Sequence, residues 1–224
     1  MAKRPYFVVG NDEITIVERE ADFVYSPGFA PSQKRKNVVA LHEAISKISP
    51  RSKILEVSTK SELDLGRKLS AFNLTWELEG THYPVECIFQ GCKVFQNGGP
   101  YKDLIKGEPL QAKRDVRLKQ SGELKQFLFR GEVWPLIPSS AFYDYVYINA
   151  LMTHPDLCEQ VVQYDTFTDI EFNPHKSINC QARSVAIFVT LHQLNRLDWL
   201  SSKALFLSIY SKQNVNNQGS LLFS

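Results

Sequence analysis

The sequence is poor in cysteine, in net charge and in long apolar runs, and each shortage argues against a class of protein. Its four cysteines form no Cys-x-x-Cys pair, so reduced thiols are expected. The formal net charge is only +2 over 224 residues, too small for a protein held on nucleic acid by general phosphate attraction. No stretch reaches the roughly 18 uninterrupted apolar residues that a membrane span requires.

Several catalytic motifs are also missing. There is no Walker phosphate loop, no Gly-x-Gly-x-x-Gly, no His-Glu-x-x-His and no nucleophile elbow, and the five histidines lack metal-ligand spacing. We therefore expect neither a cofactor nor a metal. The first residues are basic but no apolar run follows them, so we expect no secretion signal and a cytoplasmic protein.

The pattern of apolar and turn-forming residues predicts an α+β fold, mainly α, with small β-hairpins and an N-terminal β/α extension. We expect the extension over residues 1–54, the main domain over 55–211 and a mobile tail over 212–224. Residues 100–125 and 165–178 are predicted to be loops. The predicted strands lie at 5–9, 13–25 and 54–58, the hairpins at 74–85 and 127–134, and the main helices at 32–49, 86–95, 141–152 and 179–194.

The helix predicted over 86–95 carries its polar residues in an unusual way. Glu86, Gln90 and Lys93 fall at i, i+4 and i+7, on one narrow stripe of an otherwise apolar cylinder. Such a helix is buried, so its stripe meets either buried partners or a cleft. One interpretation is an internal Glu–Lys ion pair, but burying charges costs several kcal/mol per ion. A functional site in a cleft is therefore about equally favoured by this pattern.

A second apolar helix repeats the theme. Asn179 and Arg183 share one of its faces, and Asp169 and Glu171 lie in the loop before it. An arginine on such a helix needs an anion. Either one of those carboxylates pairs with Arg183 and holds the loop, or Arg183 binds a substrate phosphate.

The segments that carry these residues resemble the NADAR (YbiA-like) family. Residues 83–93, Tyr-Pro-Val-Glu-Cys-Ile-Phe-Gln-Gly-Cys-Lys, are similar to the family hallmark of an aromatic residue and Pro followed by Glu-x-x-x-Gln-x-x-Lys. Leu69-Ser70-Ala71-Phe72 resembles its Leu-Ser-Asn-Phe segment, with Asn73 two places beyond the expected asparagine. Further weaker similarities occur at 112–114, at 169–173 and at 179–182, where Gln-Ala replaces the usual Leu-Gly.

This resemblance covers roughly residues 55–197, and the additional N-terminal residues are similar to a longer branch of the family. That branch consists of antitoxins of DarT-type DNA ADP-ribosyltransferase toxins. The resemblance implies a YbiA-like domain that removes ADP-ribose from ADP-ribosylated guanine in DNA. It also implies ADP-ribose as the product and a cognate toxin as a possible partner, with no membrane involved.

Cleavage of a ribose C1–N bond places positive charge on the sugar and negative charge on the leaving nitrogen. We expect Glu86 to act as general acid/base or to stabilise the cation. Lys93 is either a Schiff-base nucleophile or a cation that orients Glu86 or binds a sugar hydroxyl. The substrate-binding residues expected beside them are Ser70, Phe72, Asn73, Gln90, Lys113, Arg114, Asp169, Glu171, Asn179 and Arg183.

Within this set, Gln90 is expected to hold ribose hydroxyls, and Lys113, Arg114 and Arg183 to bind the diphosphate. The pair Lys113-Arg114 is equally compatible with a solvated charge run. Three other functions stay open: an N-glycosidase for a small ribosylamino-pyrimidine phosphate, a non-catalytic ADP-ribose-binding protein, and an antitoxin that binds the toxin itself.

Overall fold

The computed structural model describes residues 1–10, 16–28, 30–175 and 177–210. The chain divides into two compact units. The first combines Met1–Ser70 with Asp156–Ser224, and the second is the continuous segment Ala71–Pro155. The start of the predicted strand 13–25 and the predicted tail 212–224 lie outside the described residues. The predicted domain boundaries stay predictions.

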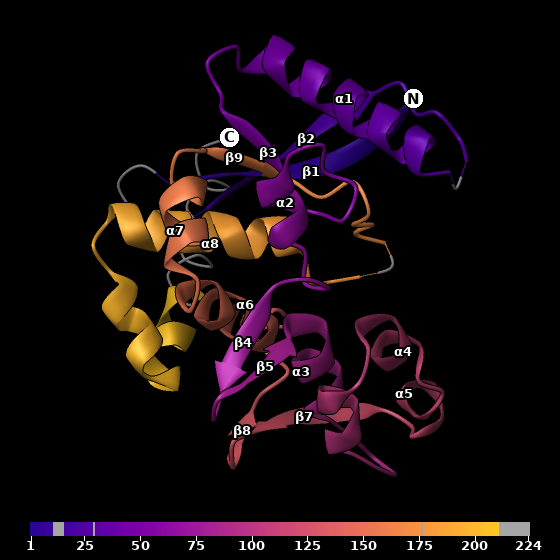
Figure 1. The fold of residues 1–224 in the computed structure, drawn as a ribbon, viewed down its shortest axis with the longest axis vertical. Helices are drawn as coiled ribbons and strands as arrows, with labels where there is room; N and C mark the ends of the chain where they lie inside the picture. Colours follow the sequence, from indigo (N-terminus) through magenta and orange to yellow (C-terminus); the bar gives the residue numbers. More distant parts are fainter. Residues whose placement is uncertain (11–15, 29, 176, 211–224) are drawn as a thin grey trace, which may run out of the picture. The chain divides into compact units, whose positions relative to one another are not determined.

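The first unit is built around a four-stranded sheet of order β2-β1-β9-β3 (Figure 1). Strand β1 is antiparallel to both β2 and β9, whereas β3 is parallel to β9. The elements of this unit are β1 (Ala2–Val8), β2 (Val17–Phe23), α1 (Pro31–Ile48), β3 (Ile54–Glu56), α2 (Asp64–Lys68), α7 (Pro155–Val161), β9 (Thr166–Thr168), α8 (Gln181–Gln193) and the 3-10 helix η2 (Leu197–Ser201).

Strand β1 is buried on both faces of its sheet. Its neighbouring residues Tyr6 and Phe7 point to opposite faces, and each is only 1% exposed. Helix α1 covers one face, where Leu41 and Ile45 pack in the same cluster as Tyr6, and α8 lies on the other side (Figure 1). The predicted helix at 32–49 therefore forms with its apolar stripe against the sheet.

A buried carboxylate sits inside this sheet and was not anticipated from the sequence. Glu56 accepts hydrogen bonds from the hydroxyls of Ser58 (2.6 Å) and Thr168 (2.7 Å), and from the backbone N–H of Ile170 (2.9 Å). Burial raises the pKa of Glu56 and these hydrogen bonds oppose that rise. His42 Nε2 lies 2.8 Å from the Thr168 hydroxyl, and burial lowers the pKa of His42 to about 4, so its ring is neutral.

Gly66 of α2 marks a point where two backbone segments meet closely. A β-carbon there would lie 2.0 Å from the Glu56 carbonyl oxygen and 2.3 Å from the Ser61 hydroxyl. We expect Gly66→Ala to lower the free energy of unfolding by about 2 kcal/mol, because a backbone oxygen cannot move aside cheaply. Urea unfolding measures this loss. Gly107→Ala is the matched control, since its nearest neighbour would be 3.4 Å away, and equal stability of the two variants would contradict the prediction.

The second unit contains two small sheets, β4-β5 and β6-β7-β8. The predicted hairpins at 74–85 and 127–134 form as β4-β5 and β7-β8, both antiparallel. The elements of this unit are β4 (Thr75–Leu78), β5 (Thr81–Pro84), α3 (Val85–Gly91), β6 (Lys93–Phe95), η1 (Lys102–Lys106), α4 (Pro109–Arg114), α5 (Arg117–Gln120), β7 (Leu124–Phe129), β8 (Glu132–Trp134) and α6 (Ala141–Met152).

Aromatic rings form the core of this unit. Phe142 of α6 stacks on Phe127 of β7 with ring centroids 4.5 Å apart, and Trp134 lies 4.5 Å from Tyr145. Phe89 of α3 joins the group, 5.4 Å from Phe127. The aromatic helix predicted at 141–152 thus forms with those bounds and anchors α3 in place.

The expected combination of helices with small sheets is confirmed, and three details differ. The helix predicted over 86–95 ends at Gly91, and Lys93–Phe95 form β6, which pairs with β7. The segment 165–178 contains β9, because pairing with both β1 and β3 outweighs its polar surroundings. The segment 100–125 contains η1, α4 and α5, which are too short for a periodic pattern to reveal.

Candidate functional site

Helix α3 places two polar side chains in the interior of the second unit. All of its residues are buried, because Phe89 packs into the aromatic core and Gly91 lets η1 approach closely. Glu86 is 5% exposed and Gln90 is 6% exposed. The Nε2 of Gln90 donates a hydrogen bond of 2.8 Å to Glu86 Oε1. The predicted placement of these two residues on one face of a buried helix is therefore confirmed.

Lys93 lies just beyond the helix, in β6, and its amine is held in a largely apolar setting. The Nζ atom is 4.6 Å from the centre of the Phe89 ring. Burial lowers the pKa of Lys93 to about 8, and the Glu86 carboxylate opposes this shift. Lys93 makes no ion pair within 4.0 Å among the residues that the structure describes. The internal pair that the sequence pattern allowed between Lys93 and Glu86 is thus not formed.

The ion pair of Glu86 is made instead by a residue from α4. Lys113 Nζ lies 3.9 Å from Glu86 Oε1 and 5.1 Å from the centre of the Phe72 ring. The Lys113 side chain is half exposed, so it marks the open side of the cluster. We call Glu86, Gln90, Lys93 and Lys113 the α3 cluster. Neighbouring Arg114 and Asn73 are exposed, and Arg114 makes no ion pair within the described ranges.

The unusual environment of Lys93 predicts a pH-dependent stability. The folded pKa of about 8 lies below the ordinary 10.5, so between these values the unfolded chain binds more protons and the free energy of unfolding rises with pH. Below about pH 8 the full cost of the buried charge is present. We expect Lys93→Met to be more stable than wild type at pH 7 and to lose this advantage by pH 10.5.

Chemical denaturation at a series of pH values measures the effect. Lys119→Met, at an exposed position of α5, is the matched control and should follow the wild-type curve. Parallel curves for wild type and Lys93→Met across pH 7 to 10.5 would contradict the prediction.

The other predicted substrate-binding residues belong to the first unit. Asp169 is 8% exposed, and its pKa is raised well above the usual range by burial and by the nearby Glu56 carboxylate. Glu171 pairs with Lys34 (3.8 Å) and Lys60 (4.0 Å). These contacts tie the loop before α8 to α1 and to the segment after β3.

The remaining candidates of this unit have different surroundings. The guanidinium of Arg183 lies 5.3 Å from the centre of the Tyr210 ring. Asn179, just before α8, has a buried Oδ1 without a hydrogen-bond partner among the described residues. Ser70 is fully buried, and its backbone N–H donates to Arg67. The predicted roles of these three residues stay predictions.

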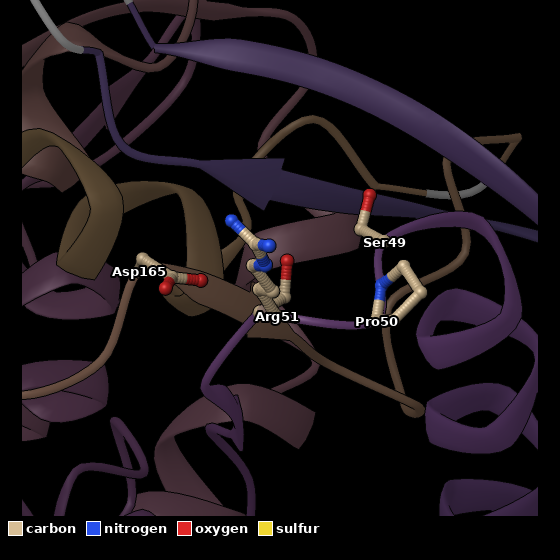
Figure 2. A pocket seen from close by; sticks show the side chains of 5 residues that line it. Ser49, Pro50, Arg51 and Asp165 are labelled. Carbon is tan, nitrogen blue, oxygen red and sulfur yellow. The ribbon is translucent and has the colours of Figure 1, made fainter.

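Two cavities lie elsewhere on the two units. One, of about 380 Å³, is lined by Ser49, Arg51 and Asp165 in the first unit (Figure 2). The Asp165 carboxylate there accepts hydrogen bonds from Lys53 N–H and the Thr166 hydroxyl, so it is engaged by its own chain. The other cavity, of about 520 Å³, lies in the second unit beside β5 and the loop that follows η1. Neither is lined by a residue of the α3 cluster.

The described residues contain no group of three or more His, Cys, Asp and Glu side chains arranged to hold a metal ion. None of the helices in this part of the chain has the length and apolar run needed to cross a bilayer. The α3 cluster consists of a buried carboxylate, a buried amide, the partly buried amine of Lys93 and the exposed amine of Lys113. Such a set can stabilise a cation, transfer protons and bind hydroxyls.

The sequence matches the family described as DarT1-associated NADAR antitoxins over residues 2–220. Because the match spans nearly the whole chain, the protein belongs to this family of antitoxins. The N-terminal strands β1 and β2 and helix α1 also lie within the matched residues, so the predicted membership of the family and of its longer, antitoxin branch is confirmed. A comparison with curated proteins finds no match.

Proposed function

We propose that this protein hydrolyses the N-glycosidic bond between ADP-ribose and guanine in DNA and so acts as the antitoxin of a DNA ADP-ribosyltransferase. Membership of the DarT1-associated NADAR antitoxins supports the biological role. The observation that carries the chemistry is the buried Glu86 carboxylate, held by Gln90 and placed near an amine of lowered pKa.

Hydrolysis breaks the bond between ribose C1 and the guanine amino nitrogen, adds the oxygen of water to C1 and returns a proton to nitrogen. Positive charge builds on the ribose as the bond lengthens. Glu86 stabilises that charge and accepts a proton from the attacking water. Because Glu86 is 5% exposed, its charge acts in a setting where water screens it weakly.

Lys93 has two roles open to it in this scheme. As a neutral amine it attacks C1, releases guanine with its amino group restored and forms an imine with the opened ribose, which water then hydrolyses. As an ammonium ion it orients Glu86 and gives a proton to the leaving nitrogen. With a pKa of about 8, both the neutral and the charged form of Lys93 are populated near pH 7.5, so both roles are compatible with this environment.

Lys113 is half exposed and pairs with the buried Glu86, which supports an approach of the negatively charged substrate from its side. Its ammonium group pairs with the carboxylate at 3.9 Å, and this pair is weak because the lysine is well hydrated. The diphosphate of ADP-ribose offers Lys113 a more strongly charged partner. We therefore assign Lys113 to the diphosphate. The other residues that stay proposed contacts of the substrate in general are Arg114, Asp169, Glu171, Asn179 and Arg183.

The test is to incubate the purified protein with an oligonucleotide that carries ADP-ribosylated guanine. We expect release of ADP-ribose and recovery of unmodified DNA by mass spectrometry. A ribosylamino-pyrimidine phosphate is offered in parallel, and we expect it to be a poor substrate. Hydrolysis of the small compound alone would replace the proposed substrate, and tight binding without release would identify an ADP-ribose-binding protein.

A further inference from the structure

The amide of Gln90 has a fixed orientation. Its Nε2 donates a hydrogen bond of 2.8 Å to Glu86 Oε1, and an amide nitrogen donates hydrogen bonds but does not accept them. The nitrogen of the amide therefore faces Glu86, and the oxygen must face away from it. One side chain thus contacts the proposed catalytic carboxylate with one end and presents an acceptor with the other.

That acceptor lacks a partner. Gln90 is 6% exposed, and its Oε1 is buried without a hydrogen bond from any of the described residues. Buried polar atoms in folded proteins are nearly always paired, and an exception calls for an explanation. A hydrogen-bond donor on a bound ligand would supply the missing partner next to Glu86.

The proposed substrate makes the nature of that donor important. An ADP-ribosylated guanine in DNA carries two bonds between a sugar C1 and a nitrogen. One joins the base to the ADP-ribose, whose ribose has free hydroxyls at C2 and C3. The other joins the base to the DNA deoxyribose, which lacks the C2 hydroxyl and whose C3 oxygen is esterified within the strand. Only the first sugar offers a hydroxyl donor beside its C1.

We propose that Gln90 Oε1 accepts a hydrogen bond from a hydroxyl of the ADP-ribose sugar and thereby selects which of the two N-glycosidic bonds meets Glu86. This inference rests on the proposed function. Placing the deoxyribose in the site leaves the amide oxygen unpaired, which disfavours cleavage that would leave an abasic site. A site that is built to bind a hydroxyl rejects analogues without it strongly, by about 10⁴-fold in favourable cases.

The experiment compares three oligonucleotides in which guanine carries ADP-ribose, its 2-deoxy analogue or its 3-deoxy analogue at the ribose attached to guanine. With wild-type protein we expect kcat/KM to fall at least about 100-fold for one of the two analogues. In Gln90→Met the same comparison should give less than about a tenfold difference, because the acceptor is gone. Gln96→Met, at an exposed position of the same unit, should discriminate as wild type does.

Equal rates of wild type on all three substrates would overturn the inference, as would undiminished discrimination by Gln90→Met. If Gln90→Met proves inactive, calorimetry tests the recognition of the hydroxyl instead. It compares the binding of ADP-ribose with that of the deoxy analogue of ADP-ribose whose DNA adduct wild type cleaves poorly. We expect wild type to prefer ADP-ribose and Gln90→Met to show no preference. If wild type released no ADP-ribose from the oligonucleotide with ordinary ADP-ribosylated guanine, the proposed function itself would be refuted. The two failures are therefore distinguishable.

Discussion

Replacement of Glu86 by glutamine lowers kcat for ADP-ribose release by about 10²- to 10⁴-fold and leaves affinity for ADP-ribosylated DNA within about tenfold of wild type. The amide cannot take a proton from water, and it does not stabilise positive charge on the ribose as a carboxylate does. Its oxygen still accepts the hydrogen bond that Gln90 donates to Glu86 in the wild type, so the shape of the α3 cluster is preserved.

Stability should change little in this variant. The lost ion pair with Lys113 spans 3.9 Å to a half-exposed lysine, and such pairs contribute less than about 1 kcal/mol. Glu77→Gln, at an exposed position of β4, is the matched control and should keep full activity. Single-turnover release of ADP-ribose and binding by fluorescence anisotropy measure the two quantities. Full activity of Glu86→Gln would remove Glu86 from the mechanism.

Lys93→Met should also abolish turnover, and the pH dependence of wild type should reveal how Lys93 acts. If its neutral amine attacks the ribose, the rate rises with pH through about 8, the value to which burial lowers the Lys93 pKa. Each unit of pH below that value then costs about tenfold in rate. Borohydride should reduce the imine and leave a ribose adduct on Lys93, which peptide mass spectrometry detects.

The alternative role of Lys93 predicts the opposite pH profile. An ammonium ion that orients Glu86 or protonates the leaving nitrogen is lost above about pH 8, so the rate falls there, and active enzyme yields no adduct. Lys119→Met, at its exposed position, controls for the loss of one lysine and should be trapped like wild type. Full activity of Lys93→Met would exclude both roles.

The sequence correctly predicted that Glu86 and Gln90 share one face of a buried helix, because helical periodicity is a local property. Their positions at i and i+4 on an apolar helix required that they share a buried face, and both are buried on α3. Lys93 was placed on the same helix, but the chain leaves the helix at Gly91. That glycine is needed where Ile105 of η1 approaches, since a β-carbon would lie 2.4 Å from its side chain. Nothing near Gly91 in the sequence reveals that approach.

Contacts between distant segments were beyond the reach of the sequence pattern. Lys113 was expected at the diphosphate, and its pairing with Glu86 depends on how α4 packs beside α3. The Glu56 network was missed for the same reason, because Thr168 and Ile170 reach that carboxylate only through sheet pairing. One signal in the sequence could have revealed this network: Glu56 is the only acidic residue in the apolar run 54–57. A carboxylate in a buried strand requires hydrogen-bond donors around it.

The order in which the ribosome makes the chain sets an order of assembly for the two units. Residues 71–155 form one continuous unit, so its two hairpins and α6 can associate as soon as this stretch has emerged. The sheet of the other unit must wait, because β9 is the strand that joins β1 to β3. Until residue 168 is available, one backbone edge of β1 and one of β3 lack the strand that pairs with both. We therefore expect a chain released early to form the second unit before the first, and to expose the unpaired strands of the first unit to quality-control proteases.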